Sequence, residues 1–371
     1  MRLTLKIKLL PTDEQADLLL STMKKANAVC NAISEIAGEN KVFNQFKIHA
    51  LCYHGFKSSF NLSAQMLVRC KSKVAGAYKL DRETKRSFRP LGAVTYDSCI
   101  LSYKDMSVSI WAIGGRLKIP FVYHNPKYLP YIKISKVEAD LVYKKGTFYL
   151  FQTIDILDEE MEDIEEFIGV DFGLTDIVVA SNGGKQSADW INSYREQRQK
   201  VRKSIQSKGT KGKMHSYKRG YAKLLKRLKG KERTTATIIN HTIAKNIVLA
   251  AKAEHKRIAI EDLTDIRFTS KRRNKTFATK LGRSSFGQLR SFLKYKSKLH
   301  GVNLIVVEPR YTSQTCSCCH HVGIRKNKSF KRPNCGNDMD ADINAAINIA
   351  TLRSAINQTE KSGMYCSLHT A

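Results

Sequence analysis

Residues 167–181, FIGVDFGLTDIVVAS, are the most informative stretch in the C-terminal part of the chain. The apolar run predicts a buried strand that ends at Asp171, and Gly173 allows a tight turn into a second apolar strand. A carboxylate on a buried strand costs free energy unless its charge is compensated. Asp171 is therefore a candidate functional residue, although a simple turn residue also fits this pattern.

Two further carboxylates belong to apolar elements downstream. The run RIAIEDL (257–263) predicts a buried strand that ends at Glu261, and VNLIVVEP (302–309) predicts another strand. The stretch ADINAAINIATLRSA (341–355) predicts a helix with Asp342 in its first turn. Further helices are expected at 236–254 and 286–301. Strands that alternate with helices indicate an α/β domain.

Three carboxylates brought together would repel one another, and divalent cations resolve that repulsion. Two Mg²⁺ ions about 4 Å apart would clamp a scissile phosphate, activate water and stabilise the leaving oxygen. The order strand-Asp171, strand-Glu261, helix-Asp342 suits an RNase H-like nuclease. Singly, Asp342 also fits a helix N-cap and Glu261 a partner for an arginine. Other acidic residues nearby are expected to be turn, cap or supporting residues: Asp176, Asp262, Asp338 and Asp340.

The charge balance indicates a polyanionic partner. The chain has 64 Lys and Arg against 33 Asp and Glu, a net charge of +31. Nucleic acid is the leading candidate, because neutralising phosphates releases counterions; a basic protein with a solvated surface is the alternative. Residues 195–233, with sixteen Lys and Arg against two Glu, predict a basic helix. Its candidate phosphate contacts are Arg198, Arg202, Lys203, Lys218, Arg219, Lys226 and Arg227.

The N-terminal part has a different composition. Residues 2–9 alternate as a strand, and Thr12 with Gln15 forms a capping box that opens a helix. Short β-branched and aromatic runs across 92–157 predict a meander or small barrel. The first strand fits this barrel, which leaves 11–85 as a helical insertion before the acidic linker that begins at 158.

The cysteines indicate metal binding rather than disulfides. No run approaches the ~20 apolar residues of a membrane span, and the opening residues lack the apolar core of a secretory signal. We therefore expect a cytoplasmic protein with reduced thiols. Cys316-x-x-Cys319 is one zinc knuckle, whereas Arg332-Pro333-Asn334-Cys335 is half of a second. Arginine cannot bind zinc, so the fourth ligand stays open between Cys318, His320 and His321; a zinc-free loop is the alternative.

Taken together, the motifs of this chain resemble those of TnpB proteins, transposon-encoded relatives of type V CRISPR effectors. The opening KLLPTDEQADLL resembles the TnpB N-terminus. The following motifs stand in the TnpB order: FIGVDFGLTDIVVAS, the basic segment, NHTIAKNIVLAAK, IAIEDL, FGQLRSFLKYKS, EPRYTSQTCSCC and DADINAAINIA. The resemblance thus covers nearly the whole chain, and YTSQTC followed by D-x-N-A-A-x-N-I is its most specific part.

The resemblance implies an α+β multidomain fold. An oligonucleotide-binding-like wedge β-barrel (1–10 and 86–157) would carry a helical recognition insertion (11–85). An RNase H-like RuvC nuclease domain would contain an inserted zinc-ribbon-like module that binds target nucleic acid. That domain is expected at 158–310 and 338–355, the module at 311–337 and a tail at 356–371.

The resemblance also implies a prokaryotic, nucleoid-associated protein and a function. A guide RNA from the transposon end would direct cleavage of double-stranded DNA beside a short adjacent motif. Asp171, Glu261 and Asp342 match the family's catalytic, Mg²⁺-binding carboxylates. The zinc-ligand positions are matched by Cys316, Cys319 and Cys335.

Two departures from the family pattern concern the zinc module. Arg332 replaces the usual third cysteine and His320 a usual glycine. An RNA-guided repressor that no longer cuts DNA is therefore the alternative function. A transposase or resolvase with an RNase H-like core is a further possibility, but no feature of the sequence explains strand transfer.

Overall fold

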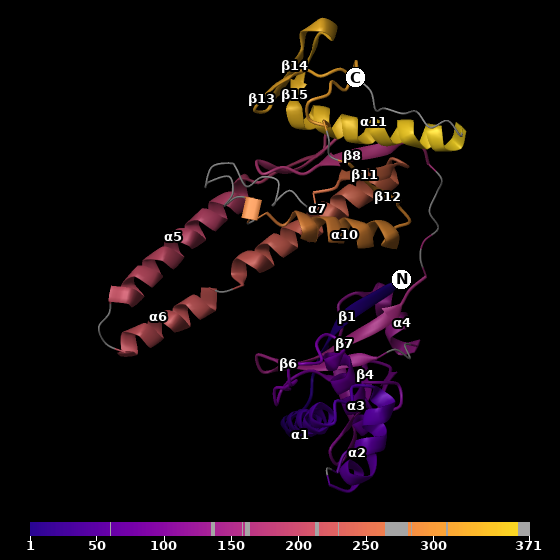
Figure 1. Cartoon of the computed structure of the whole chain (residues 1–371), viewed down its shortest axis with the longest axis vertical. Helices are drawn as coiled ribbons and strands as arrows, with labels where there is room; N and C mark the ends of the chain where they lie inside the picture. The colour runs from indigo at the N-terminus through magenta and orange to yellow at the C-terminus, as the bar shows by residue number, and fades with distance from the viewer. Residues whose placement is uncertain are drawn as a thin grey trace. The chain divides into compact units, whose positions relative to one another are not determined.

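The structure, a computed structural model, describes residues 1–59, 61–134, 138–157, 159, 164–211, 215–228, 230–263, 281–282, 284–308 and 311–362. The chain divides into two compact units, Met1–Leu157 and Asp158–Ala371 (Figure 1). None of the described helices is long and apolar enough to cross a membrane.

The first unit contains a seven-stranded antiparallel sheet with the order β2-β6-β7-β1-β5-β4-β3. The N-terminal strand β1 lies between β5 and β7, so it joins the sheet as its sequence predicted. The strands are β1 (Arg2–Leu9), β2 (Val94–Tyr96), β3 (Leu101–Lys104), β4 (Ser107–Ala112), β5 (Gly115–Val122), β6 (Ala139–Lys144) and β7 (Thr147–Asp155).

Two long-range hydrogen bonds connect strands that are not neighbours in this sheet. The Tyr96 hydroxyl donates to the Trp111 carbonyl over 3.1 Å, and the Tyr103 hydroxyl donates to the Gln152 side chain over 2.8 Å. Buried side chains alternate along β7, which is the pattern of a sheet with one face on a core. The sheet therefore curls into a nearly closed barrel, in agreement with the predicted wedge barrel.

Helices α1 (Asp13–Glu39), α2 (Gln45–Ser59) and α3 (Ala64–Tyr78) lie in sequence between β1 and β2. The capping box at the start of α1 is present, since Thr12 accepts from the Gln15 N–H and the Gln15 side chain accepts from the Thr12 N–H. Part of the predicted β region 92–157 is helical instead. Residues Leu129–Ile134 form the short helix α4 after a 3₁₀ turn, η1 (Pro126–Tyr128), which the Asn125 side chain caps.

The second unit is built on a five-stranded mixed sheet with the order β10-β9-β8-β11-β12. Strand β9 is antiparallel to both β8 and β10, whereas β8, β11 and β12 are mutually parallel. This is the predicted RNase H-like arrangement. The strands are β8 (Phe167–Asp171), β9 (Asp176–Ala180), β10 (Lys185–Ser187), β11 (Arg257–Glu261) and β12 (Leu304–Val307).

Helices cover both faces of this sheet (Figure 1). Helices α7 (Lys231–Ala253) and α10 (Phe286–Leu299) pack on one face, where Ile168, Val170 and Ile260 belong to the main apolar core. Helix α11 (Ala341–Ser362) covers the other face, and its Ile349 packs with Phe167 of β8. Side chains along β8 and β11 therefore alternate between the two faces.

Gly169 of β8 permits this close packing of α11. A Cβ atom at this position would lie 1.9 Å from the Ala346 carbonyl oxygen of α11. Only glycine leaves room for a helix backbone at that distance from a strand. The first turn of α11 is thereby brought close to the end of β8.

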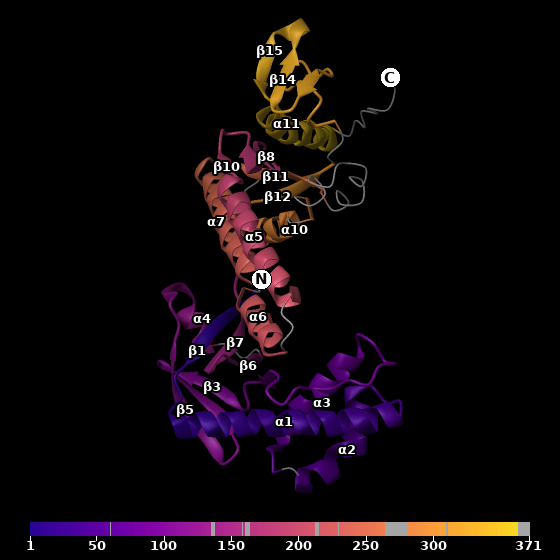
Figure 2. The ribbon, with the colours of Figure 1, turned by 90° about the vertical axis from the view of Figure 1, so that its left-hand side faces the viewer.

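The basic segment 195–233 does not form the single helix that its sequence predicted. It is divided among α5 (Asp189–Lys211), α6 (His215–Leu228) and the start of α7, and α5 and α6 extend away from the sheet as a helical hairpin (Figure 2). Tyr221 of α6 packs beside Gly209 of α5, where a Cβ atom would lie 3.2 Å from the tyrosine side chain. Gly230, with φ of 86°, stands directly before α7 in a conformation that glycine readily adopts.

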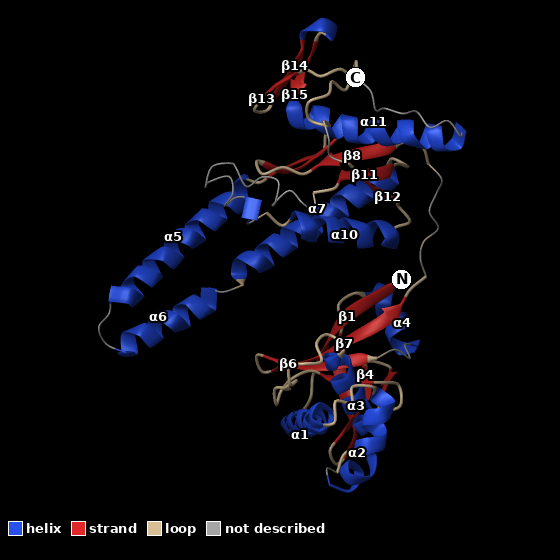
Figure 3. Ribbon diagram, in the orientation of Figure 1, coloured by secondary structure: helices blue, strands red, loops and turns tan. Residues whose placement is uncertain are grey.

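A small three-stranded antiparallel sheet lies between β12 and α11 in sequence (Figure 3). Its elements are β13 (Ile324–Lys326), β14 (Ser329–Arg332), the 3₁₀ turn η2 (Pro333–Cys335) and β15 (Asn337–Asp340). Strand β15 continues past residue 337, the expected end of the module, and leads directly into α11.

Candidate active site

Asp171 and Glu261 lie side by side at one edge of the five-stranded sheet. Ile260 of β11 pairs with Val170 of β8, so the next residues of these parallel strands are Glu261 and Asp171. Val170 and Ile260 face the core beneath α7 and α10. Because side chains alternate, Asp171 and Glu261 face the side that α11 covers.

Asp342 approaches from the first turn of α11. The Asp340 carboxylate accepts the Asp342 N–H at 2.8 Å and the Ile343 N–H at 3.4 Å, and it thereby caps the helix. The cap role that fitted Asp342 in the sequence thus belongs to Asp340. The Asp342 side chain, 13% exposed, is available for another role.

The charges of Glu261 and Asp342 raise the energy of the charged form of Asp171. Burial, and then the charges of Glu261 and Asp342, raise the pKa of Asp171 to about 7. Burial also raises the pKa of Glu261 and that of Asp342. Carboxylate oxygens are the ligands that Mg²⁺ prefers, so these residues are candidates to bind a divalent cation.

Arg325 of β13 provides the positive charge nearest to this cluster that the described side chains show. Its guanidinium donates to the Asp342 carboxylate over 3.0 Å. Its charge lowers the pKa of Asp171, Glu261 and Asp342, against the effect of burial. The sequence did not identify Arg325, because only the fold of the small sheet brings it to the carboxylates.

Thr312 and two asparagines of α11 support Glu261 through a chain of hydrogen bonds. The Thr312 hydroxyl donates to the Glu261 carboxylate. Asn348 donates to the Thr312 and Thr315 carbonyls at 2.8 and 2.7 Å, and Asn344 donates to the Thr315 carbonyl at 2.7 Å. The sequence carried a signal for both asparagines, which stand four residues apart on an apolar helix and are buried.

A second ionic group fixes the small sheet to the five-stranded one. Asp176 of β9, 3% exposed, pairs with Lys328 from the β13–β14 turn and with Lys185 of β10 at 3.2 Å. Both lysines lower the pKa of Asp176 against the opposing effect of burial. Asp176 is thus a supporting residue near the three carboxylates, and it anchors the turn that follows Arg325.

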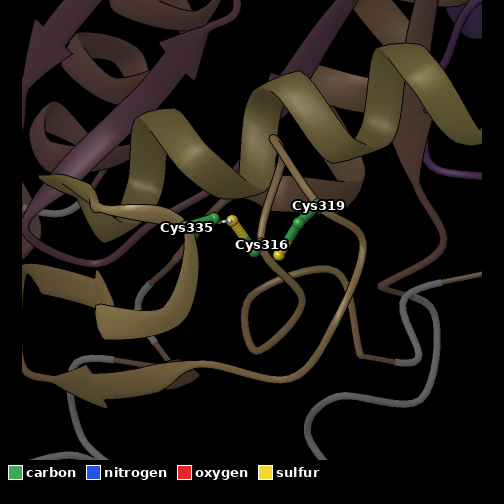
Figure 4. Close-up of side chains that lie close together, drawn as sticks. All are labelled: Cys316, Cys319 and Cys335. Carbon is green, nitrogen blue, oxygen red and sulfur yellow. Dashed lines mark hydrogen bonds between the residues drawn. The ribbon is translucent and has the colours of Figure 1, made fainter.

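Cys316, Cys319 and Cys335 form a candidate metal centre (Figure 4). Their sulfur atoms lie within 4.8 Å of one another, and those of Cys316 and Cys335 are 3.6 Å apart. Among the described residues, this group does not include His320 or His321, which were candidates for the fourth ligand. The Nδ1 of His321 lies 2.7 Å from the Cys319 carbonyl oxygen. Hydrogen bonds, first from the His321 backbone, lower the pKa of Cys319 to about 7, which favours the thiolate that zinc binds. Three sulfur ligands in one group fit a zinc ion. The described residues do not identify a fourth ligand.

Comparisons with known proteins show which proteins this chain resembles. A family model described as Cas12f1-like, TNB domain matches residues 286–349, which include Arg325 and the three clustered cysteines. The chain is 28% identical over 158 residues to a TnpB-like protein of Methanocaldococcus jannaschii, covering 42% of this chain and 54% of that protein. It is 30% identical over 241 residues to the CRISPR-associated endodeoxyribonuclease Cas12f2 of a Micrarchaeota archaeon, covering 58% of this chain and 42% of that protein.

The chain is thus similar to a TnpB-like protein and to a Cas12f protein. It spans about half the length of the curated relatives that it matches. Its fold aligns with a cryo-EM structure of a Cas12f1–sgRNA–target DNA complex at a TM-score of 0.60 and 15% identity, covering 91% of this chain and 83% of that one. At this identity the likeness shows only that this chain shares its fold with Cas12f1.

Arg332 is where this chain departs from the expected cysteine pattern. Its guanidinium donates to the Val322 carbonyl over 2.8 Å, and a hydrogen bond from its side chain helps to lower the pKa of the Cys319 thiol. A positive charge thus stands beside a sulfur atom of the cysteine group.

The predicted phosphate-binding residues of this chain lie on the helical hairpin. Arg202 and Lys203 of α5 are exposed, and so are Arg219, Lys226 and Arg227 of α6. Arg198 is partly exposed and lies over the Tyr194 ring, with 5.0 Å between the guanidinium carbon and the ring centroid. The side chain of Lys218 lies outside the described residues, as does that of Tyr217. The structure therefore gathers most of these cations on one extended element.

Proposed function

We propose that this chain is an RNA-guided DNA endonuclease that hydrolyses phosphodiester bonds of target DNA beside a short adjacent motif. The observation that carries the proposal is the meeting of carboxylates from β8, β11 and α11 at one edge of an RNase H-like sheet. Asp171, Glu261 and Asp342 are the proposed catalytic residues. The relatives named as a TnpB-like protein and as a CRISPR-associated endodeoxyribonuclease support the same activity.

The three carboxylates are proposed to hold two Mg²⁺ ions. Bound there, Mg²⁺ would polarise the scissile phosphate, activate the attacking water and stabilise the leaving oxygen. Thr312 restricts Glu261 to one orientation through its hydrogen bond. Arg325, whose planar guanidinium suits two phosphate oxygens at once, would bind the backbone of the strand to be cut.

The proposed partners are a guide RNA from the transposon end and double-stranded DNA. Base pairing with the guide would supply sequence specificity, while the protein grips the backbone of the heteroduplex. The exposed cations of α5 and α6 are proposed as phosphate contacts, since a basic, elongated surface suits a polyanion. The cysteine group is proposed to bind one zinc ion that stabilises the small sheet.

The test begins with sequencing of the RNA that copurifies with the protein, followed by cleavage of a DNA library with randomised bases beside the target. Asp171→Asn should reduce cleavage at least about a thousandfold, which equals about 4 kcal/mol in the activation free energy, with RNA binding retained. Asp338→Asn is the matched control, because Asp338 is an exposed partner of Lys331 at 2.8 Å. Wild-type cleavage by Asp171→Asn would refute the assignment.

An RNA-guided repressor is the second candidate, and the observation that favours it is Arg332 in the cysteine group. The same assay separates the two functions. A repressor would bind the programmed DNA with the same dependence on the guide, yet neither wild type nor Asp171→Asn would produce cut DNA at any Mg²⁺ concentration.

A further inference from the structure

Helix α5 begins with an exposed aromatic stack. Trp190 is 64% exposed, although a large apolar side chain is usually buried. Its ring lies parallel to that of Tyr194, with centroids 5.7 Å apart and an angle of 7° between the planes. Arg198 covers the Tyr194 ring at 5.0 Å. The three residues follow one another at four-residue spacing and therefore share one face of the helix.

The stack is fixed in place by the rest of α5. Ile191 is 3% exposed and anchors the first turn. Arg195 pairs with Glu232 of α7 over 3.6 Å. A hydrogen bond with Thr235 of α7 lowers the pKa of Tyr194, so this ring is also tied to the neighbouring helix. Since these contacts hold the helix against rotation, Trp190 stays on the exposed side.

The stack starts beside the carboxylate edge of the sheet. Strand β10, which leads into α5, runs in the same direction as β8, because β9 is antiparallel to both. The Ala188 N–H donates to the Thr175 carbonyl over 2.9 Å, and Asn192 donates to the Leu174 carbonyl over 3.4 Å. Leu174 and Thr175 belong to the turn that follows Asp171. The aromatic face thus leads from that turn outward along α5.

The charge of the helix indicates what would cover this face. Lys200, Arg202 and Lys203 are exposed one turn further along α5. Aromatic rings joined to a row of cations are the combination that binds single-stranded nucleic acid, in which bases stack while phosphates meet positive charge. Paired bases in a duplex do not offer their faces in this way, so the ligand must be unpaired.

We propose that Trp190, Tyr194 and Arg198 form a stacking platform for unpaired bases of the DNA strand that approaches the three carboxylates. The platform deepens the proposed nuclease function and rests on it for the identity of the strand. It would hold the bases that flank the scissile phosphate and so keep the backbone extended at the cutting site.

Tryptophan fluorescence of the full-length chain tests the platform directly. The chain has two tryptophans, Trp111 and Trp190, so Trp111→Phe leaves Trp190 as the sole indole. In EDTA, a short oligo-dT strand should quench Trp190, whereas an abasic strand of equal length should bind without quenching. If Trp111→Phe folds poorly, the difference between the wild-type and Trp190→Phe spectra gives the same signal.

Affinity measurements supply the second readout. Trp190→Ala should weaken oligo-dT binding about tenfold, the usual effect of losing one stacked base, and Trp190→Phe should restore most of it. Phe46→Ala is the matched control, because Phe46 is an aromatic residue of α2 that is 81% exposed. Equal oligo-dT affinity of wild type and Trp190→Ala would overturn the proposal.

Three further outcomes would also overturn it. Trp190 of the free protein could resist a soluble quencher, which would mean that protein covers it. The copurifying RNA could quench Trp190 fully so that DNA adds nothing, which would assign the face to the guide. DNA could be cleaved in Mg²⁺ while its binding leaves Trp190 fluorescence unchanged, which would refute the platform and leave the nuclease function intact. Conversely, quenching by a chain that never cuts DNA would refute only the nuclease function.

Discussion

Among single residues, Asp171 makes the clearest link between charge and stability. Its pKa rises from 3.8 to about 7 in the folded protein, mainly through burial. Between these values the folded state keeps a proton that the unfolded state releases, so rising pH reduces the free energy of unfolding. Without Mg²⁺, wild type should therefore lose stability relative to Asp171→Asn as the pH increases from 3.8 to about 7. Urea denaturation of both proteins in EDTA at several pH values measures this difference.

Mg²⁺ provides the control for that experiment. A cation bound by the carboxylates stabilises the folded state of wild type and not, or less, that of Asp171→Asn. The loss with pH should therefore shrink as Mg²⁺ is added. A stability difference between the two proteins that is independent of both pH and Mg²⁺ would contradict the carboxylate cluster.

Thr312 is expected to act on metal affinity through Glu261. Thr312→Val removes the hydroxyl that donates to the Glu261 carboxylate and leaves a nearly isosteric side chain. Losing a hydrogen-bond partner of a metal ligand typically weakens metal binding about 10- to 100-fold. Titration of cleavage with Mg²⁺ should show this shift for Thr312→Val, and Thr312→Ser should reverse it. Identical Mg²⁺ requirements for Thr312→Val and wild type would assign Thr312 a purely structural role.

The residues of the candidate site were unequally visible in the sequence. Asp171 and Glu261 stood out because an acidic residue at the end of an apolar strand is costly without a purpose. Arg325 and Thr312 did not, since an arginine or threonine in a polar loop is ordinary. Their roles depend on contacts between segments that lie far apart in the chain. The cap of α11 was ambiguous because Asp340 and Asp342 both stand near its start.

At the level of elements, the contact of α11 with β8 positions Asp342. Gly169→Ala would place a Cβ atom 1.9 Å from the Ala346 carbonyl oxygen and force α11 away from the sheet. We expect a stability loss of about 1–3 kcal/mol and strongly reduced cleavage. Thermal unfolding and the cleavage assay measure the two effects. Gly287→Ala of α10 is the control, because a Cβ atom there meets no atom within 4 Å; equal behaviour of the two variants would contradict the close contact.

The small sheet offers a second prediction at this level. Arg332→Cys would supply a fourth sulfur beside Cys316, Cys319 and Cys335, which completes a tetrahedral zinc site. Purified wild type should contain about one zinc ion per chain, and Arg332→Cys should retain it at higher chelator concentrations. Metal analysis of the two proteins during dialysis against a chelator measures this. A wild type free of zinc would support the alternative of a metal-free loop.

Local sequence patterns predicted most elements of the second unit. Strands β8 and β11 and helix α10 follow from apolar periodicity alone. The division of the basic segment into α5, α6 and α7 did not follow from the sequence. Lysine and arginine favour a helix along the whole segment and do not mark where one helix ends and the next begins. The packing of Tyr221 beside Gly209 is a contact between two helices, which the single-helix prediction excluded.

For the whole molecule, the net charge of +31 governs how it meets nucleic acid. The affinity of a basic protein for DNA falls with salt in proportion to the number of phosphates that it neutralises. Exposed cations without a carboxylate partner should contribute most, since a paired cation is already partly compensated. The helical hairpin of α5 and α6 is therefore expected to dominate the salt dependence.

Replacing Arg202, Lys203 and Lys226 with alanine should reduce the slope of log affinity against log salt by about 2 to 3, because three phosphate contacts are lost. Fluorescence anisotropy of a labelled DNA strand, measured across a salt series, gives this slope. The control removes three cations that pair with carboxylates, namely Arg2 with Asp155 at 3.0 Å, Lys85 with Glu35 at 2.7 Å and Lys331 with Asp338 at 2.8 Å. Both variants lose the same net charge, so only contacts at the hairpin separate them. Equal slopes for the two variants would show that net charge alone attracts DNA and would remove α5 and α6 from the proposed interface.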